Sequence, residues 1–330
     1  MSENPIRIGV IRNPQSQRNR KNPRGYAAAA VTTPANIQLA IVEPASPQDL
    51  PQVLVGFAQS RINHVVVDGG DGTLRDVLSL LPAIYGAKLP KITVFAGGNA
   101  NLAAADIGVK GHGARALQQL LTALARTDGG RYERRHMLMA HWPDGSHAPV
   151  MGFFAGTAGF YRGWKMAMGP VSRRGLLHGP AVAVTMLGAL WQTVAGSHGN
   201  VWKSGAPMVI GIDDGAPGEG ARFLFLATSL HRMYGSLWPF FDHGDAVLRW
   251  LDIDAHAPRL GRALLSLLRG RPLPWLRASG AYRSGGAQQR ITLRLTEPLV
   301  VDGEAYAPGA DGLIELRPGP EFEFYLPLKI

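Results

Sequence analysis

A glycine-rich run with one carboxylate is the part of the sequence best suited to chemistry. Residues 69–73 read Gly-Gly-Asp-Gly-Thr and directly follow a strand-like run at residues 64–68. Three glycines in four positions let backbone N–H groups approach and surround phosphate oxygens. The acid in the run, Asp71, can hold a magnesium ion or a nucleophilic hydroxyl group. The run therefore predicts a phosphate-binding turn with an acidic group beside it.

A helix is expected to begin at this turn. Apolar residues at positions 74, 77, 78 and 81 follow helical spacing. The unpaired N–H groups and the dipole of a helix N-terminus favour a bound anion. The run lacks the Gly-Lys-Ser/Thr ending of a Walker loop and the glycine spacing of a Rossmann fingerprint. A bare strand-to-helix turn is the alternative, but it does not need three glycines with an acid and Thr73.

The glycine run is similar to the motif shared by diacylglycerol kinases, sphingosine kinases, bacterial lipid kinases and, more distantly, NAD kinases. Three further segments lie in the order that this superfamily would require. Asn13 and Pro14, after the first strand-like run, resemble the Asn-Pro turn of these families, which contacts nucleotide phosphates. Residues 300–304 resemble the late Asp-Gly-Glu motif of the lipid kinases, which supplies a second acidic pair. By itself an Asp-Gly-Glu run is usually a hairpin turn, but the presence of the glycine run in the same chain favours the catalytic interpretation.

The third segment, residues 96–103, resembles the Pro-x-Gly-Thr-x-Asn segment at the family's nucleotide site. Gly98 and Asn101 match this pattern. Ala96 replaces the proline and Asn99 replaces the threonine, although Asn99 can still offer hydrogen bonds.

The resemblance implies an ATP- and Mg²⁺-dependent kinase that transfers the γ-phosphoryl group to a lipid hydroxyl, of diacylglycerol or sphingoid type, in phospholipid metabolism. It implies that Asp71 and Asp302 are the catalytic and metal-binding residues, without deciding which of them is the general base. The implied nucleotide contacts are Asn13, Gly69, Gly70, Gly72, Thr73, Gly98, Asn99, Asn101 and Glu304.

Two other functions remain open at this point. An NAD kinase would share the glycine run but phosphorylate a soluble dinucleotide. A catalytically inactive nucleotide- or lipid-binding protein is the second alternative, motivated by the departures at Ala96, Asn99 and His243.

The pattern of apolar runs predicts two domains. Strand-like runs at residues 6–11, 37–42, 64–68 and 92–95 alternate with helical patterns, which predicts a doubly wound, mostly parallel sheet. After about residue 134, short strand-like runs separated by Gly, Pro and Asp turns predict an antiparallel, sandwich-like β-rich domain. We therefore expect an α/β nucleotide-binding domain at residues 1–133 and a β-rich lipid or substrate domain at residues 134–330. We leave open that the last residues return to the first domain.

Composition limits the partners. The 330 residues carry a formal net charge of +10, which favours anionic partners such as a nucleotide, a phospholipid surface or nucleic acid. No nucleic-acid-binding module is recognisable, so we expect no nucleic-acid partner. The absence of cysteine excludes disulfides, Cys-ligated zinc and thiol catalysis. Since the first residues lack the pattern of a secretory signal, we expect a cytoplasmic protein, peripheral to the inner face of the membrane, and a homodimer is left open.

Three segments leave two interpretations each. The apolar stretch at residues 179–196 is at the lower limit of length for a transmembrane span, and His178, Gln192 and His198 bracket or interrupt it, so we expect no span but either core or a wall that accepts lipid. Arginines around the apolar stripe at residues 260–268 suit either an anionic membrane surface or a helix packed on a sheet. The basic loop at residues 15–25 is either solvated or in contact with phosphate.

Overall fold

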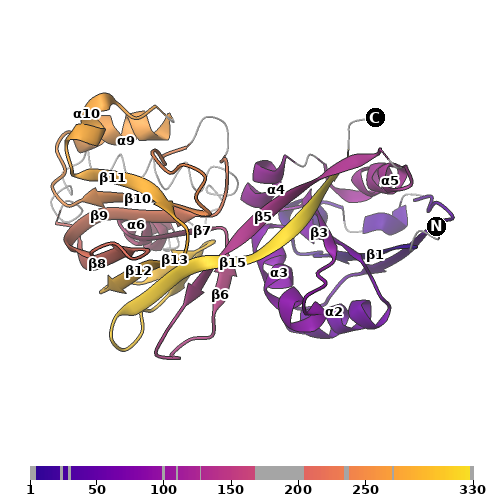
Figure 1. Ribbon diagram of the computed structural model, residues 1–330. Coiled ribbons are helices and arrows are strands. Elements are labelled where there is room, and N and C mark those ends of the chain that lie inside the picture. The colour runs from indigo at the N-terminus through magenta and orange to yellow at the C-terminus, as the bar shows by residue number, and fades with distance from the viewer. Residues whose placement is uncertain are drawn as a thin grey trace. The chain divides into compact units, whose positions relative to one another are not determined.

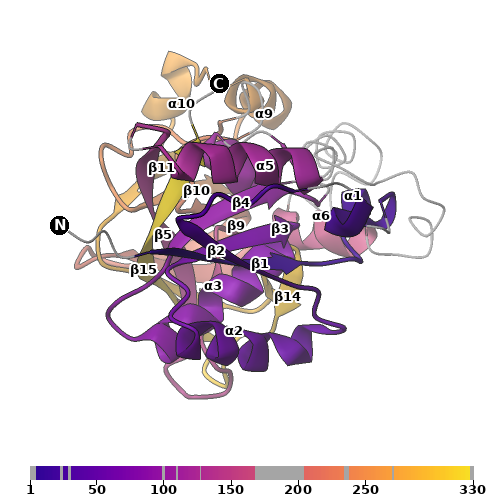
Figure 2. The ribbon, with the colours of Figure 1, turned by 90° about the vertical axis from the view of Figure 1, so that its right-hand side faces the viewer.

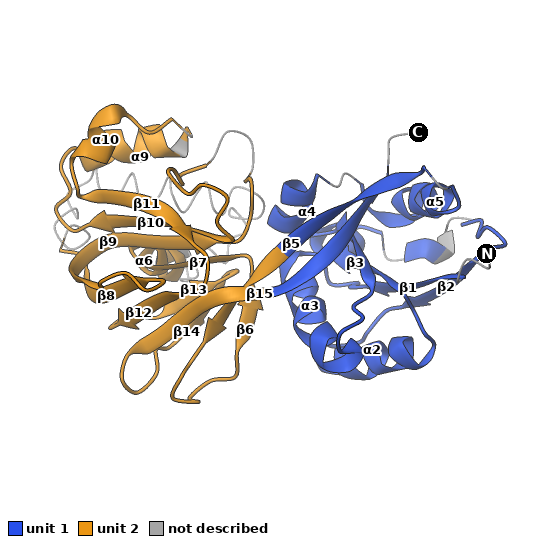
Figure 3. Cartoon of the chain, in the orientation of Figure 1, with its two compact units in different colours: residues 1–135, 320–330 blue, residues 136–319 orange. Residues whose placement is uncertain are grey.

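The computed structural model, shown from two sides in Figures 1 and 2, describes most of the chain. The described residues are 5–22, 25–28, 31–98, 101–108, 111–126, 128–167, 204–233, 238–269 and 271–327. Two predictions, the contact at Asn99 and the apolar stretch at residues 179–196, lie outside these residues. The chain divides into two compact units, of which the first contains residues 1–135 and 320–330 and the second residues 136–319 (Figure 3).

The first unit is built on five parallel strands in the order β15–β4–β3–β1–β2. The strands are β1 (Ile6–Arg12), β2 (Ile37–Val42), β3 (His64–Gly69), β4 (Lys91–Ala96) and the C-terminal part of β15 (Leu313–Pro327). The start of β5 (Gly130–His141) also lies in this unit, and β5 pairs with β15. The longer helices are α2 (Leu50–Gln59), α3 (Asp71–Tyr85) and α5 (Gly113–Leu124). Shorter turns of helix are α1 (Gln17–Arg20), η1 (Gly25–Ala28), η2 (Pro47–Asp49) and α4 (Leu102–Ile107).

Helices cover both faces of this sheet, which explains why all residues of β3 are buried. Figure 2 shows α5 on one side of the strands, with α2 and α3 on the other. Val66 of β3 belongs to the core cluster that includes Leu117 and Leu121 of α5. On the opposite face, Gly9 of β1 lies so close to the ring of Phe57 on α2 that an added Cβ would clash with it. The predicted doubly wound, parallel sheet is therefore confirmed.

The order of the strands places a switch point between β1 and β3. The connection after β1 leads to β2 on one side, and the connection after β3 leads to β4 on the other. In open α/β sheets, ligands bind outside the carboxyl ends of the strands at such a point. Asn13 follows β1 and the glycine run follows β3, so two of the predicted segments meet there.

The second unit is antiparallel, as predicted. Its strand order is β14–β13–β7–β9–β8–β12–β15, with β10 paired to both β9 and β11, and β6 paired to β5. The strands not yet named are β6 (Val150–Gly152), β7 (Phe154–Ala158), β8 (Ala206–Ile212), β9 (Gly218–Thr228), β10 (Leu248–Asp254), β11 (Tyr282–Ala287), β12 (Ile291–Leu295), β13 (Leu299–Val301) and β14 (Glu304–Tyr306). Its described helices are α6 (Gly159–Ala167), α9 (Leu260–Leu268) and α10 (Pro274–Ala278). In the part of the chain that the structure describes, no helix is both long and apolar enough to cross a membrane.

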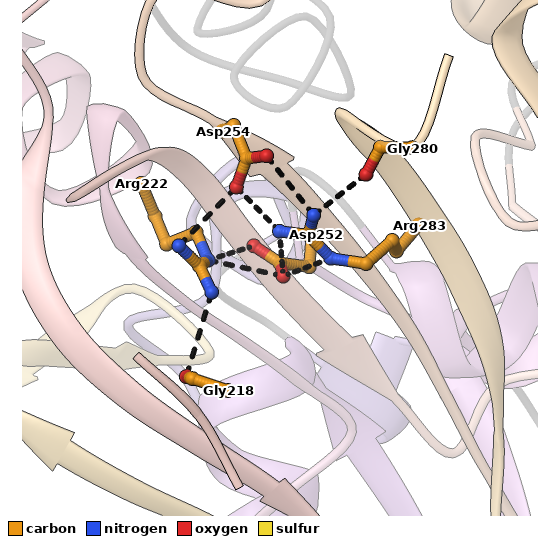
Figure 4. Close-up of polar contacts among 6 residues, drawn as sticks. All are labelled: Gly218, Arg222, Asp252, Asp254, Gly280 and Arg283. Carbon is orange, nitrogen blue, oxygen red and sulfur yellow. Dashed lines mark hydrogen bonds and ion pairs between the residues drawn. The ribbon is translucent and has the colours of Figure 1, made fainter. Parts of the chain in front are cut away.

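Four charged side chains join β9, β10 and β11 (Figure 4). Nε of Arg222 on β9 lies 3.0 Å from Oδ1 of Asp252 on β10, and Nη1 lies 3.2 Å from Asp254. Arg283 on β11 reaches the same two carboxylates, at 2.6 Å and 2.5 Å. Its hydrogen bonds to Asp254 raise the pKa of Arg283 further above its usual range. Two buried or half-buried acids are thus balanced by two arginines, which ties three neighbouring strands together.

Candidate nucleotide site and the late acidic turn

A hydrogen bond joins the two loops at the switch point. Nδ2 of Asn13 donates to Oγ1 of Thr73 at 2.8 Å. The backbone of Asn13 is fixed as well, because its N–H donates to the carbonyl oxygen of Asp68 at 2.9 Å. Its side-chain oxygen accepts the N–H of Gln15 at 2.9 Å. The loop after β1 is therefore held against the first turn of α3.

A cavity of about 130 Å³ lies beside this bond. Its lining comes from the end of β1 and the loop after it, the loop after β2, and the start of α3: Ile11, Asn13, Gln15, Pro44, Ala45, Ser46, Pro47, Leu50, Thr73 and Asp76. Proline and aliphatic side chains form one part of the lining, and amide, hydroxyl and carboxylate groups form the rest. The cavity is smaller than the roughly 300 Å³ at which drug-sized pockets begin, so it suits one ring of a ligand.

Two different structural reasons explain why glycine occurs in the run at residues 69–73. An added Cβ at Gly69 would lie 2.7 Å from Cβ of Thr73, and one at Gly70 would lie 3.2 Å from Cα of Gly98. These two glycines therefore let the turn pack against its own helix and against the turn after β4. At Gly72, by contrast, an added Cβ would meet nothing within 4 Å. Gly72 leaves open space at the N-terminus of α3, where a helix favours an anion.

The carboxylate of Asp71 accepts hydrogen bonds from the start of α4. Oδ2 accepts the N–H of Leu102 at 3.0 Å, and Oδ1 accepts the N–H of Ala103 at 3.2 Å. Burial raises the pKa of Asp71, while these backbone donors act in the opposite direction. Asp71 thus caps α4 from a distant part of the chain. Sequence reasoning missed this role, because a cap that comes from 31 positions away leaves no local pattern.

Asn101 shapes the turn before α4. Its Oδ1 accepts the N–H of Gly98 at 2.9 Å, and its Nδ2 donates to the carbonyl oxygen of Gly98 at 2.8 Å. The residue is buried and has a left-handed backbone, with φ 47°. Both ends of its side-chain amide therefore hold the turn that packs on Gly70.

A buried acid anchors the basic loop that follows β1. Oδ2 of Asp68 accepts the hydroxyl of Tyr26 at 2.6 Å, and Oδ1 accepts Nδ2 of Asn19 at 3.3 Å. Burial raises the pKa of Asp68, and the two donors lower it. The backbone N–H of Arg18 donates to the carbonyl oxygen of Gly97 at 3.0 Å. The loop is thus fixed to β3 and to the turn after β4, although the sequence predicted only a charged loop.

Arg12 also helps to fix the basic loop that follows β1. Its side chain is buried and lies 2.8 Å from Oε1 of Glu43 and 2.7 Å from the carbonyl oxygen of Asn22. Sequence analysis did not single out Asp68 or Arg12. The available signal was a charged residue at the end of each of two apolar strands, since a buried charge requires partners.

The Asp-Gly-Glu segment forms a hairpin turn in the second unit. Val301 pairs with Glu304, so Asp302 and Gly303 are the two residues of the turn, with φ 45° and 91°. Such positive values are typical of a type I′ hairpin. The Asp302 carboxylate accepts the N–H groups of Phe153 at 3.0 Å and Phe154 at 2.9 Å. Glu304 is exposed and accepts the hydroxyl of Tyr306 at 2.7 Å.

The first unit therefore brings together the predicted catalytic residue Asp71 and most of the predicted nucleotide contacts, namely Asn13, Gly69, Gly70, Gly72, Thr73, Gly98 and Asn101. Asp302 and Glu304 belong to the second unit. Among the described residues, no three His, Asp or Glu side chains gather in the way that would hold a metal ion by themselves.

Comparison with known proteins agrees with the motifs. Residues 7–131 match the family model of the diacylglycerol kinase catalytic domain. The fold is similar to the crystal structure of a diacylglycerol kinase from Bacillus anthracis str. Sterne, with a TM-score of 0.61 and 16% identity over 98% of this chain and 97% of that chain. A second structure from the same organism gives a TM-score of 0.64 at 16% identity, over 98% of both chains. No curated protein shows significant similarity to the sequence. The predicted resemblance to the diacylglycerol kinase catalytic-domain family is thereby confirmed for residues 7–131, the segment that the family model matches.

Proposed function

We propose that this protein is an ATP- and Mg²⁺-dependent lipid kinase that transfers the γ-phosphoryl group to a lipid hydroxyl of diacylglycerol or sphingoid type. The observation that carries the proposal is the bond between Asn13 and Thr73 beside the cavity at the switch point. This is where an open α/β sheet binds its ligand, and it lies inside the segment that matches the kinase family.

The triphosphate binds at the N-terminus of α3. The open space at Gly72 leaves room for phosphate oxygens beside the N–H groups of the first helical turn. The cavity next to Thr73 accepts the ribose or the base, whose apolar faces suit the lining of Pro44, Pro47 and Leu50. Asp76 at the cavity offers a carboxylate to a ribose hydroxyl or to an amino group of the base.

The donor chemistry of Asp71 fits a magnesium ion. Magnesium is usually held by one or two carboxylates together with substrate phosphates and water, so a cluster of three acids is not required. Each carboxylate oxygen can accept more than one bond, and the bonds to Leu102 and Ala103 leave this capacity. When bound, the ion neutralises charge on the phosphates.

Asp71 and Asp302 share one arrangement. Each carboxylate accepts the N–H groups of two consecutive residues, which fixes its orientation. One of the two orders the metal and its water, and the other accepts the proton of the acceptor hydroxyl. We assign the acceptor lipid to the second unit and the protein to the surface of the inner membrane leaflet.

The test is a phosphoryl-transfer assay that does not presuppose the acceptor. The purified protein is incubated with γ-labelled ATP and Mg²⁺, in parallel with a total lipid extract and with NAD, and products are identified by mass spectrometry. We expect label in a phosphorylated lipid and none in NAD. Label in NAD would assign the protein to NAD phosphorylation instead. Nucleotide binding without transfer to any acceptor would show an inactive binding protein.

A further inference from the structure

One segment of the second unit is strongly cationic. Residues 255–281 contain five arginines and one histidine but no aspartate or glutamate. The segment forms α9 and α10, which lie together at one end of the second unit in Figures 1 and 3. Such a run of one charge is a candidate for binding an anionic partner.

The structure decides how α9 uses its apolar stripe. Four residues face inward and are 6% exposed or less: Leu260, Ala263, Leu264 and Leu267. The interpretation of the stripe as ordinary packing is therefore correct. The opposite face carries Arg259, Arg262, Leu265 and Arg269, all exposed and spaced by three or four positions. Because the apolar stripe packs into the core, the outer face of α9 carries arginines around a single apolar side chain, that of Leu265.

The charges on this face are matched by no acid in the part of the chain that the structure describes. Among the residues that the structure describes, Arg259, Arg262, Arg269 and Arg271 form no ion pair, whereas Arg277 on α10 pairs with Asp242 at 2.9 Å. The two arginines of the network in Figure 4, in the same unit, are by contrast paired with two carboxylates. The outer face thus presents positive charge to the solvent.

An aromatic side chain links the two helices. The guanidinium of Arg259 lies 5.7 Å from the ring centre of Trp275, and Trp275 meets Tyr282 edge to face at 5.8 Å. The hydroxyl of Tyr282 donates to the carbonyl oxygen of Pro258 at 2.6 Å, just before α9. These contacts link the start of α9 to α10 and hold Arg259 beside Trp275. Leu265, which is 41% exposed, lies among the arginines of the outer face.

We propose that the outer face of α9 and the loop after it (Arg259, Arg262, Leu265, Arg269 and Arg271), hereafter the arginine face, binds the surface of an anionic phospholipid membrane. Arginine side chains can reach lipid phosphates while their stems stay against the protein. Leu265 can enter the boundary between headgroups and acyl chains. Nucleic acid would satisfy the charge but would gain little from an apolar residue at the centre of the face. The binding itself requires neither nucleotide nor catalysis.

The test is vesicle sedimentation of the full chain without nucleotide. We expect binding to vesicles that contain phosphatidylglycerol, little binding to pure phosphatidylcholine, and loss of binding at high salt because the charges are screened. Replacing both Arg262 and Arg269 by Ala should lower partitioning about 25-fold, since one arginine near a charged membrane is worth a factor of about five. The matched control replaces Arg126 and Arg131 by Ala, which removes equal charge from the first unit and should leave binding unchanged.

The Leu265→Ser variant distinguishes binding to a membrane from binding to other anionic partners. We expect it to weaken vesicle binding several-fold at constant charge, because the apolar contact is lost. If duplex DNA competes with vesicles and Leu265→Ser binds DNA as the parent does, the face binds nucleic acid and the membrane proposal is wrong. Equal losses in the Arg262/Arg269 and Arg126/Arg131 variants would also overturn it. A kinase assay on micellar lipid reads the proposed function independently, so the two proposals can fail separately.

Discussion

The side-chain amide of Asn13 donates a hydrogen bond to Oγ1 of Thr73 at 2.8 Å, across the switch point of the parallel sheet. This bond closes the loop after one strand onto the helix that follows another. Both residues line the cavity that we assign to the nucleotide. It is therefore the contact whose removal should change nucleotide binding with the least change elsewhere.

Thr73→Val removes the acceptor and keeps the shape of the side chain. We expect KM for ATP to rise about five- to tenfold, since an ordinary hydrogen bond contributes about 1 kcal/mol. Thr122→Val is the matched control, because the Thr122 hydroxyl bonds only within the exposed face of α5, to the carbonyl oxygen of Gln118. Steady-state kinetics at varied ATP checks this. If KM for ATP is unchanged in Thr73→Val, the hydrogen bond between Asn13 and Thr73 does not contribute to the nucleotide site.

Asp71→Asn should affect both activity and stability. We expect turnover to be lost, and the free energy of unfolding to fall by about 1–3 kcal/mol, because an amide nitrogen would face one of the backbone N–H donors of α4. Denaturant unfolding, nucleotide binding and single-turnover kinetics measure these effects separately. Near-normal phosphoryl transfer in a folded Asp71→Asn protein would leave Asp71 as a helix cap only.

The interior of the first unit should lose stability in acid because of His64. This side chain is buried beside Thr93, with Nε2 2.8 Å from the hydroxyl, and burial lowers its pKa to about 3. In the unfolded chain its pKa is about 6.5, so the unfolded state binds the proton first. Stability is therefore complete above about pH 6.5 and falls as the pH drops toward 3, by up to about 1.4 kcal/mol per unit.

His64→Gln isolates this contribution. The raised pKa values of Asp68 and Asp71 act with the opposite sign, since these groups take up protons more readily in the folded protein. The comparison is the pH dependence of the unfolding free energy in the parent and in the variant. We expect a flatter acid limb in His64→Gln, and parallel curves would contradict the assignment.

Arg222→Met should be strongly destabilising. Its side chain is 8% exposed, and its removal leaves Asp252 with one arginine instead of two. Breaking a buried ion pair costs about 3–5 kcal/mol. Arg277→Met is the control, because its bidentate bond to Asp242 is exposed and its loss should hardly move the thermal midpoint. Similar midpoints for both variants would show that the network in Figure 4 contributes little.

The sequence predicted the sheet of the first unit well. The strands β1, β3 and β4 are largely buried, and each contains an apolar run. The edge strand β2 is mostly exposed or half-buried, yet the run at residues 37–42 has its bounds. The glycine run and Asn13 were found because a turn at the end of a strand has a local pattern. The helix predicted after the glycine run extends beyond its apolar positions 74–81, since α3 begins at Asp71 and ends at Tyr85.

Strands that contain glycine or proline were missed. The β11 sequence Tyr-Arg-Ser-Gly-Gly-Ala looks like a turn, yet Gly286 has a packing reason, because an added Cβ would lie 2.1 Å from Cβ of Ala246 and 2.5 Å from the carbonyl oxygen of His243. In β15, Pro318 and Pro320 interrupt the strand-like pattern, but the strand continues to Pro327. The apolar residues 150–154 look like one strand, but β6 and β7 are separated at Phe153. Packing that links distant residues decides these cases.

The path of β15 has a consequence for synthesis and truncation. Phe324 pairs with Ile92 of β4, and Tyr325 lies in the core of the first unit. A fragment that stops at residue 135 would leave one edge of β4 without its neighbour and would expose a hydrophobic seam prone to aggregation. During translation, the sheet of the first unit cannot be completed until the residues of β15 near Phe324 have been synthesised, almost at the end of the chain.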